Sequence, residues 1–383
     1  MPMLPLSDVR VLDLSRVLAG PFATMLLGDL GADVIKVEQP GRGDDTRHWG
    51  PPFAGDESAY FLAINRNKRS ITADLKHPPD VRRVLELASK ADIIIENFRR
   101  GTQKTLGIDY DSVRSRNRRI IYCSISSFGP GLDETKPGYD FLIQARGGVM
   151  GITGHPDGEP TKVGVAVVDM ICGLYAANAI LAAVHARATT GHGCYIEVPL
   201  YESQVSWLSN RAQAFLISGK DPGRLGNAHP SIMPYQTFHA GDKMIAVAVG
   251  NDLQFRALCK VIEDQELAND ERFAHNPGRV KNRDELGKVL STEFAKQPAQ
   301  FWITRLQAAG VPCGPVNSLA EVFSDPHLLS SGLLQEINHP VVGKLRTVAS
   351  PILIDGERLP IRRAPPTLGQ HDREVEHGEQ DTL

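Results

Sequence analysis

The stretch VRVLDLSRVLAGPFATMLLGDLGADVIKVE (residues 9–38) decides the fold. Its first six residues form a short apolar-rich run of the kind that makes a buried strand. A longer apolar run predicts a helix over residues 21–29, because Pro21 suits the start of a helix and Gly31 suits its end. Residues 33–38 predict a second strand. A strand, a helical crossover and a second strand form a βαβ unit, whose two strands run parallel.

The same alternation continues through residue 126. Further strands are predicted at residues 70–75, 93–97 and 120–126, with a helix over residues 79–90. This alternation predicts an α/β fold, with a Rossmann-like large domain whose parallel sheet has helices on both faces. A dinucleotide site would need GxGxxG directly after the first strand, where this chain has LSRVLAGP. The sequence also lacks GxxxxGK, so NAD and ATP are both disfavoured as ligands.

The middle of the chain predicts a second, smaller domain. A Gly- and Pro-rich segment, residues 219–230, predicts a linker, and residues 235–249 predict a β-hairpin. Amphipathic helices are expected to follow, which makes this domain α+β. We expect a large domain over residues 1–220, a small domain over residues 221–325 and a C-terminal segment over residues 326–383.

Composition narrows the class of protein. The 383 residues are 42% hydrophobic and 23% charged, which excludes a disordered, collagen-like or coiled-coil chain. The net charge is −3, so no overall basic field indicates nucleic acid as a partner. Five cysteines without a CxxC pair indicate a reducing compartment rather than a disulfide framework.

Targeting and membrane signals are weak. The N-terminus resembles neither a signal peptide nor a transit peptide. The central apolar stretch, residues 163–184, is interrupted by Asp169, Gly173 and Asn178, so it is not expected to span a membrane. We therefore expect a cytoplasmic enzyme without a membrane or nucleic-acid partner.

Asp169 is the only charged residue between Lys162 and His185. A lone carboxylate in an apolar run is costly to bury unless it is paired, caps a helix or has a function. Asp169 could cap a helix that starts at Met170. It could also act chemically, and the two roles are compatible because amide donors at a helix N-terminus can hold an oxyanion.

Two further groups leave alternatives open. Arg66, Lys68, Arg69 and Lys76 cluster around one strand, as a solvated loop face or as a local site for phosphates. His229 lies in the linker, as a structural histidine or as a site histidine. The twelve histidines form no HxxxH or HExxH motif, so a metal site is not expected. The GxSxG elbow of a serine hydrolase is also missing.

Several segments together resemble the class III CoA-transferases, the family of formyl-CoA transferase and carnitine CoA-transferase. These segments follow the order of the family over nearly the whole chain: residues 17–47, 65–76, 95–98 and 138–140, Asp169 with its helix, and residues 310–316 and 364–371. Residues 14–38 and 226–238 resemble the subgroup that transfers CoA from succinyl-CoA to dicarboxylic acids such as hydroxymethylglutarate or glutarate.

The resemblance implies a mechanism and a set of site residues. Asp169 matches the catalytic carboxylate, which forms an aspartyl–acyl anhydride with the donor and then an aspartyl–CoA thioester. The GYD motif puts Tyr139 and Asp140 beside the substrate. The family's CoA contacts fall on Val17, Leu18, Leu75, Lys76, Asn97, Phe98, Arg99 and Lys136.

The resemblance also implies partners and assembly. CoA thioesters and a small carboxylic acid are expected as substrates, with no permanently bound cofactor. Both chain ends are expected to build the large domain, so residues 326–383 would return to it. Two subunits are expected to interlock as a homodimer.

Departures from the family pattern affect the choice of reaction. An arginine that contacts CoA in formyl-CoA transferase is Gln39 here, and the glycine-rich tetraloop of that enzyme is replaced by GNAHPSIMPY. Formyl or oxalyl transfer is therefore disfavoured. The α-methylacyl-CoA racemases of the same family use a histidine base where this chain has Tyr139, and an ordinary tyrosine is a poor base at neutral pH. Racemisation and a non-catalytic CoA-binding protein stay open as alternatives.

Arg47 is our candidate for binding the distal carboxylate of a dicarboxylic acid, with His229 as a second candidate. A desolvated carboxylate needs a cationic or donor-rich partner. The alternative for Arg47 is a structural ion pair with Asp44 or Asp45.

Overall fold

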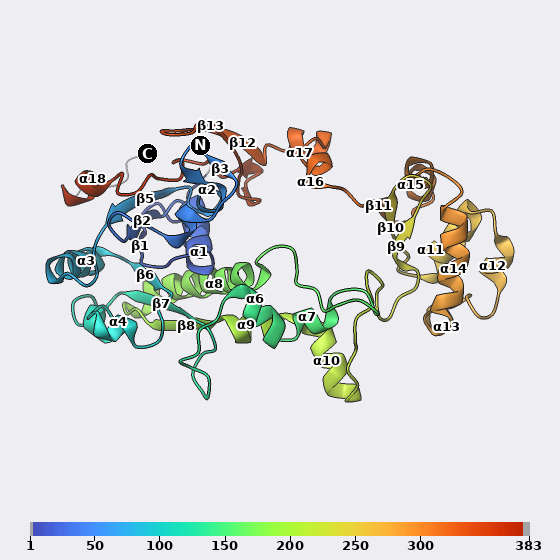
Figure 1. Cartoon of the computed structure of the whole chain (residues 1–383), viewed down its shortest axis with the longest axis horizontal. Coiled ribbons are helices and arrows are strands. Elements are labelled where there is room, and N and C mark those ends of the chain that lie inside the picture. Colours follow the sequence, from blue (N-terminus) through green and yellow to red (C-terminus); the bar gives the residue numbers. More distant parts are fainter. Residues whose placement is uncertain (1–2, 378–383) are drawn as a thin grey trace. The chain divides into compact units, whose positions relative to one another are not determined.

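Figure 1 shows the computed structural model of the chain, which describes residues 3–377. Contacts divide the chain into two compact units. Unit 1 contains Met1–Val149, Lys162–Gly219 and Pro326–Leu383, and unit 2 contains Met150–Thr161 and Lys220–Asp325. Two of these boundaries fall within a residue of the expected domain limits, while Met150–Thr161 joins unit 2 although we expected it in the large domain.

A six-stranded parallel sheet forms the centre of unit 1, with strand order β5-β2-β1-β6-β7-β8. In Figure 1 these strands follow one another from the top of unit 1 downward. The strands are β1 (Arg10–Asp13), β2 (Asp33–Glu38), β5 (Lys68–Thr72), β6 (Ile93–Glu96), β7 (Ile121–Ser126) and β8 (Tyr195–Pro199). This is the order of a Rossmann-like sheet, as the alternation of strands and helices predicts.

Helices cover both faces of the sheet because successive strand residues point to opposite sides. The face toward α1 (Ala19–Asp29) and α8 (Val167–Thr190) buries Val11, Val34, Ile93, Ile95, Ile121 and Cys123. The face toward α3 (Pro78–Lys90) and α5 (Tyr110–Arg114) buries Leu12, Ile35, Ile94 and Tyr122. The central strands are therefore apolar on both sides, which confirms the expected fold class.

Shorter elements complete unit 1. The N-terminal half adds η1 (Asp45–His48), β3 (Phe53–Ala54), β4 (Glu57–Ser58), α2 (Ala59–Ile64), α4 (Thr102–Thr105), α6 (Asp140–Arg146), α7 (Val149–Ile152), which continues into unit 2, α9 (Leu200–Trp207) and α10 (Ser209–Ser218). The C-terminal part adds α17 (Pro326–Ser330), β12 (Leu334–His339), β13 (Gly343–Val348), β14 (Leu353–Ile354), β15 (Glu357–Arg358) and α18 (Asp372–Glu376).

The C-terminal segment returns to the large unit and covers the edge strand β5. The Nδ1 atom of His371 accepts a hydrogen bond from the Ser70 amide, and the His371 amide donates to the Ser70 carbonyl. The Asp372 carboxylate accepts from the Thr72 amide at 2.8 Å. Backbone groups at this sheet edge are thus satisfied by a loop and side chains instead of another strand, which protects the edge from unwanted pairing.

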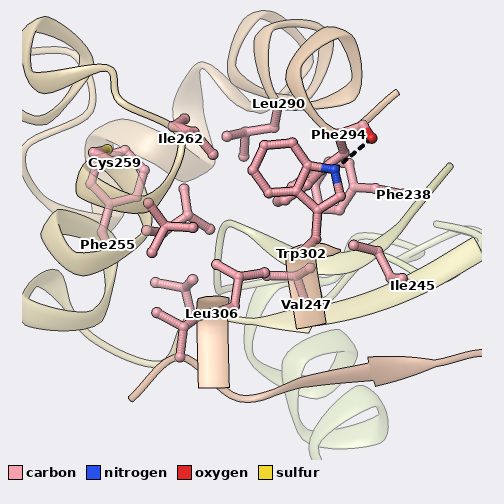
Figure 2. Close-up of a cluster of buried hydrophobic side chains, with 14 of the residues drawn as sticks. Phe238, Ile245, Val247, Phe255, Cys259, Ile262, Leu290, Phe294, Trp302 and Leu306 are labelled. Atoms are coloured by element: carbon pink, nitrogen blue, oxygen red, sulfur yellow. Dashed lines mark hydrogen bonds between the residues drawn. The ribbon is translucent and has the colours of Figure 1, made fainter. Parts of the chain in front are cut away.

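Unit 2 has its own core, shown in Figure 2. Its sheet has the antiparallel order β11-β10-β9, from β9 (Tyr235–His239), β10 (Met244–Ala248) and β11 (Cys313–Pro315). Its helices are α11 (Asp252–Val261), α12 (Gln265–Asn269), α13 (Asn276–Lys281), α14 (Arg283–Phe294), α15 (Ala299–Ala308) and α16 (Leu319–Val322). Trp302 packs edge-on against Phe294 and donates from Nε1 to its carbonyl at 2.8 Å.

Helix α8 packs closely on α1 because small residues line the contact. A Cβ atom added at Gly173 would lie 2.7 Å from the Ala19 carbonyl oxygen and 2.9 Å from the Phe22 ring. Among residues 3–377, α8 is the one helix long and apolar enough to cross a membrane, and half of that stretch is buried in the protein. Its contacts with α1 and the sheet are those of a core helix.

We predict that Gly173→Ala destabilises the protein by about 1–3 kcal/mol, because the added methyl group overpacks the contact with α1. Urea denaturation measures the loss. Gly287→Ala is the matched control, since this glycine also lies in a helix but a Cβ there would meet its nearest atom at 3.7 Å. The control should gain up to about 1 kcal/mol from helix propensity. Equal effects of the two substitutions would contradict the close contact.

Candidate active site

A cavity lies at the carboxyl edge of the unit 1 sheet. The strand order reverses between β1 and β6, so the segments that follow these strands diverge and leave a crevice where ligands of such sheets bind. Residues 16–19 follow β1, residues 97–99 follow β6, and residues 126–127 end β7 and follow it. Residues 137–139 and Asp169 line the same cavity.

Asp169 reaches this cavity from the first turn of α8. The helix begins at Val167, three residues before the expected start, and its N-cap residue Ala166 makes no side-chain cap. The prediction that Asp169 caps a helix from Met170 is therefore wrong. Because Asp169 lies inside the helix, its carboxylate does not accept hydrogen bonds from the free amides at the helix N-terminus.

Asp140 takes over the capping role from the start of α6. One oxygen of its carboxylate accepts a hydrogen bond from the Val168 amide at 2.8 Å and a longer one from the Asp169 amide at 3.4 Å. The other oxygen accepts from Gln144 Nε2 at 2.7 Å. Free amides at a helix start need such acceptors. Asp140 therefore fixes the turn that carries Asp169, and its negative charge lies close to the Asp169 carboxyl group.

Burial raises the pKa of the Asp169 carboxyl group to about 7, and the negative charge of Asp140 adds to this shift. Asp169 is only 9% exposed. Among the described residues, none forms an ion pair or side-chain hydrogen bond with the Asp169 carboxylate. A poorly solvated and basic carboxylate of this kind suits nucleophilic attack or proton transfer.

A second carboxyl group supports the cavity wall. Glu96 ends β6 and is fully buried, and one of its oxygens accepts a hydrogen bond from the Phe98 amide at 2.7 Å. Burial raises the pKa of Glu96 to about 7. Since Phe98 lines the cavity and Glu96 does not, Glu96 shapes the wall from behind.

Seven of the site residues expected from the sequence meet at the cavity. They are Val17, Leu18, Asn97, Phe98, Arg99, Tyr139 and Asp169. Asp140 lies directly behind them through its hydrogen bonds to α8. Residues from four separate segments are thus brought to one place.

Three expected CoA contacts lie outside the cavity lining. Leu75 packs on the apolar cluster of the opposite sheet face, and Lys76 is exposed in the turn before α3. Lys136 lies on the exposed loop that leads to the cavity, with its Nζ atom 2.6 Å from the Asp133 carboxylate.

Arg47 does not reach the cavity. Its guanidinium group is buried and donates to both oxygens of Glu38 at 2.8 Å, and it also donates to the Pro366 carbonyl at 3.0 Å. The ring of Phe61 lies 3.6 Å below the guanidinium carbon. Arg47 is therefore a structural ion-pair residue and not the free cation that we expected for a substrate carboxylate. Its acidic partners are Glu38 and, at 3.4 Å, Glu57, neither Asp44 nor Asp45.

His229 belongs to unit 2. Its Nδ1 atom accepts a hydrogen bond from the Ser231 amide at 3.1 Å, and its ring packs on Tyr235. These contacts fit a structural role in the loop, and a role in binding substrate stays a prediction.

The basic cluster around β5 forms neither a phosphate site nor a solvated loop face. Arg66, Lys68 and Arg69 are buried and pair with three aspartates, Asp29, Asp13 and Asp33 respectively. Only Lys76 of the four expected cations is exposed. Side chains at successive strand positions point to opposite faces, so these cations separate and each meets a partner from another segment.

Several cavity residues were not singled out from the sequence. They include Arg16, Ala19, Asp45, Ser126, Ser127 and Gly138. Their place in the sequence could have indicated them, because most of them lie at or after the carboxyl ends of β1 and β7, where ligands of open α/β sheets bind. Asp45 comes from η1 and could be placed only in the folded chain.

Comparisons with known proteins show which proteins the chain resembles. The model of CoA-transferase family III matches residues 6–372. The chain is 46% identical to succinyl-CoA:glutarate CoA-transferase of Mus musculus, over 97% of this chain and 86% of that protein. It is 44% identical to succinate–glutarate CoA-transferase of Agrobacterium fabrum, over 97% and 94%. A solved CAIB/BAIF family protein from Brucella suis is 43% identical, with a TM-score of 0.87 over 98% of this chain and 99% of that one.

We predict that Asp169→Asn stabilises the protein at pH 8. The Asp169 pKa rises from 3.8 to about 7 on folding, so the folded state holds an unfavourable charge above pH 7. Removing that charge should raise the free energy of unfolding by up to about 4 kcal/mol, at about 1.4 kcal/mol for each pKa unit. The gain should shrink as the pH falls through 7 toward 4. Denaturation curves at pH 8 and pH 5 measure it, and a loss of stability at pH 8 would contradict the burial argument.

Proposed function

The chain belongs to CoA-transferase family III, and from this membership and the cavity we propose that it transfers CoA from succinyl-CoA to a dicarboxylic acid such as glutarate or hydroxymethylglutarate. Asp169 is the proposed nucleophile. The names of the mouse and Agrobacterium relatives support this donor and this class of acceptor. The observation that carries the proposal is the buried Asp169 carboxylate, which faces the cavity without a cation paired to it among the described residues.

The first half-reaction moves CoA onto the protein. A carboxylate oxygen of Asp169 attacks the thioester carbon of succinyl-CoA, the carbon–sulfur bond breaks, and CoA leaves as a thiolate. This gives a mixed anhydride between Asp169 and succinate. The thiolate then attacks the aspartyl carbon of the anhydride and releases succinate, so that CoA is held as a thioester on Asp169.

The second half-reaction repeats these steps in reverse order. The carboxylate of the acceptor acid attacks the aspartyl thioester, which releases the CoA thiolate and forms a new anhydride. The thiolate attacks the acceptor's carbonyl carbon, and Asp169 leaves as a carboxylate. Every bond that forms is balanced by one that breaks, and no oxidant, reductant or metal ion is consumed.

The surroundings of Asp169 favour this chemistry. A carboxylate that is buried and has no partner is more basic than one in water, as its raised pKa expresses, and is therefore a stronger nucleophile. The hydrogen bonds from the α8 amides to Asp140 fix the position of the attacking group. The racemases of the family use a histidine base where this chain has Tyr139, which argues against racemisation here.

A homodimer is part of the proposal. Large apolar side chains of unit 1 are exposed on α8 and α10, among them Leu174, Tyr175, Leu216 and Ile217. Exposed apolar surface of this kind is typical of a surface that a partner covers. The interlocked form that the resemblance implies stays a prediction.

We predict that the purified protein, given succinyl-CoA and an acceptor acid in deuterated water, forms a new acyl-CoA without deuterium at the α-carbon. Glutarate, hydroxymethylglutarate, itaconate, malate and oxalate are compared by mass spectrometry, and glutarate should react best because the names of the mouse and Agrobacterium relatives contain it. Asp169→Asn should lower turnover by at least about 10⁴-fold, as expected for loss of a nucleophile.

Asp45→Asn is the matched control for this assay. Asp45 lines the same cavity but pairs with Arg16 and Arg42, so its amide variant should keep turnover within about tenfold of the wild type. Substantial turnover by Asp169→Asn would refute the nucleophile. Deuterium in the acyl group of a branched acyl-CoA, without transfer, would identify a racemase instead.

We predict that kcat/KM for succinyl-CoA falls on the acid side with an apparent pKa of about 7, since only ionised Asp169 can attack. Burial also raises the pKa of Glu96 to about 7, so a second variant separates the two groups. Glu96→Gln keeps an acceptor for the Phe98 amide, and the fall of kcat/KM at low pH should persist in this variant. If that fall disappears in Glu96→Gln, the titrating group is Glu96.

A further inference from the structure

The segment between β1 and α1 has a strained backbone where it borders the cavity. Val17 has a φ angle of +72°, in the left-handed region that β-branched residues rarely adopt. Val17 and its neighbours Arg16 and Leu18 line the cavity together with Asp169. Strain at a binding surface persists only when surrounding groups hold it in place.

Asn97, the residue directly after β6, holds this segment. Its Oδ1 atom accepts a hydrogen bond from the Arg16 amide at 2.9 Å, and its Nδ2 atom donates to the Arg16 carbonyl at 2.7 Å. Both ends of the Asn97 amide are thus used on one peptide segment of the protein itself. Arg16 precedes Val17, so these bonds fix the chain immediately before the strained residue.

A buried ion pair also holds this segment. The amide of Val17 points to both oxygens of Asp44, at 3.3 Å each. The Lys36 Nζ atom lies 2.9 Å from an Asp44 oxygen and donates to the Ser15 carbonyl at 2.9 Å. The side chains of Lys36 and Asp44 are completely buried. Burial acts to raise the pKa of Asp44, but Lys36 and Thr46 outweigh it and lower that pKa to about 2, so the ion pair persists at any working pH.

Close packing leaves the segment little room to relax. A Cβ atom at Gly20 would lie 2.2 Å from the Ser15 hydroxyl oxygen, so the segment folds directly over the start of α1. Ser15 itself donates its backbone amide to the Asp13 carboxylate at 3.0 Å. Backbone groups of three successive residues, 15–17, are therefore bound by side chains from β1, from β2, from the residue after β6 and from the N-cap of η1.

We propose that Asn97, Asp44 and Lys36 are positioning residues that hold Val17 in its strained conformation, so that acyl-CoA meets a preformed wall beside Asp169. The inference rests on the proposed function and deepens it, because it assigns Asn97 to the protein's own backbone before any ligand arrives. A wall that is already ordered lowers the entropy cost of binding, which benefits affinity. Asn97 then acts on CoA through the Val17 segment.

Hydrogen exchange of the ligand-free protein tests this assignment. In Asn97→Ala the Arg16 amide loses its acceptor, and we expect peptides that cover residues 15–18 to exchange at least about tenfold faster than in the wild type. Asn117→Ala is the matched control. Asn117 also bridges backbone groups, from Ala91 to Arg119, but lies outside the cavity lining. Unchanged exchange at residues 15–18 in Asn97→Ala would overturn the proposal.

Binding of coenzyme A, measured by calorimetry, links the segment to function. Asn97→Ala should weaken CoA binding and raise KM for succinyl-CoA about tenfold, with kcat nearly unchanged, because the wall contacts ground state and transition state alike. Asn117→Ala should change neither. In a Val17→Gly background, where φ of +72° costs little, the same Asn97 substitution should cost no more than about threefold.

The same tenfold loss in both backgrounds would mean that Asn97 binds CoA directly, and would overturn the proposal. The proposed function fails separately, by the absence of any CoA binding in the wild-type protein. The exchange experiment needs no ligand, so it decides on the positioning role even in that case.

Discussion

The unpaired carboxylate in the first turn of α8 is the constraint on which the proposed active site depends. Burying Asp169 without a cation is costly, and its raised pKa measures that cost. The fold can hold this group because α8 packs on α1. In addition, Asp140 accepts the hydrogen bonds of the free amides at the start of α8, so Asp169 is not needed as their acceptor. The protein thus loses stability at one position, where a buried carboxylate is left without a partner.

Other buried charged groups around the first βαβ unit each have a partner of opposite charge. Lys36 pairs with Asp44, Lys68 with Asp13, and Arg47 with Glu38. Removing one partner of such a pair would leave an uncompensated buried charge, so the pairs fix their segments firmly. Lys36 and Asp44 also bind backbone groups of Ser15 and Val17, and Glu38 accepts a hydrogen bond from the Asp44 amide. Asp169 differs from these groups because its charge has no partner of opposite sign among the described residues, which supports the proposal that it is the reacting group.

Much of the large unit could be predicted from sequence, because the apolar runs of residues 9–38 have the lengths and breaks of a βαβ unit. The position of the cavity also follows from strand order. The partners of individual charges could not be predicted in this way. Arg47 meets Glu38 across a turn, and Asp140 caps a helix 28 residues further along the chain. Such pairings are set by tertiary packing, so neighbouring charges in sequence gave a misleading picture of a phosphate site.

The most direct test of this account is to look for CoA bound covalently to Asp169. The protein is incubated with succinyl-CoA without an acceptor acid, digested at low pH and examined by mass spectrometry. We expect the peptide that contains Asp169 to carry the mass of CoA less one water, and to lose it when glutarate is added. CoA attached to another residue, or turnover with no adduct on Asp169 at any time, would contradict the central role of this carboxylate.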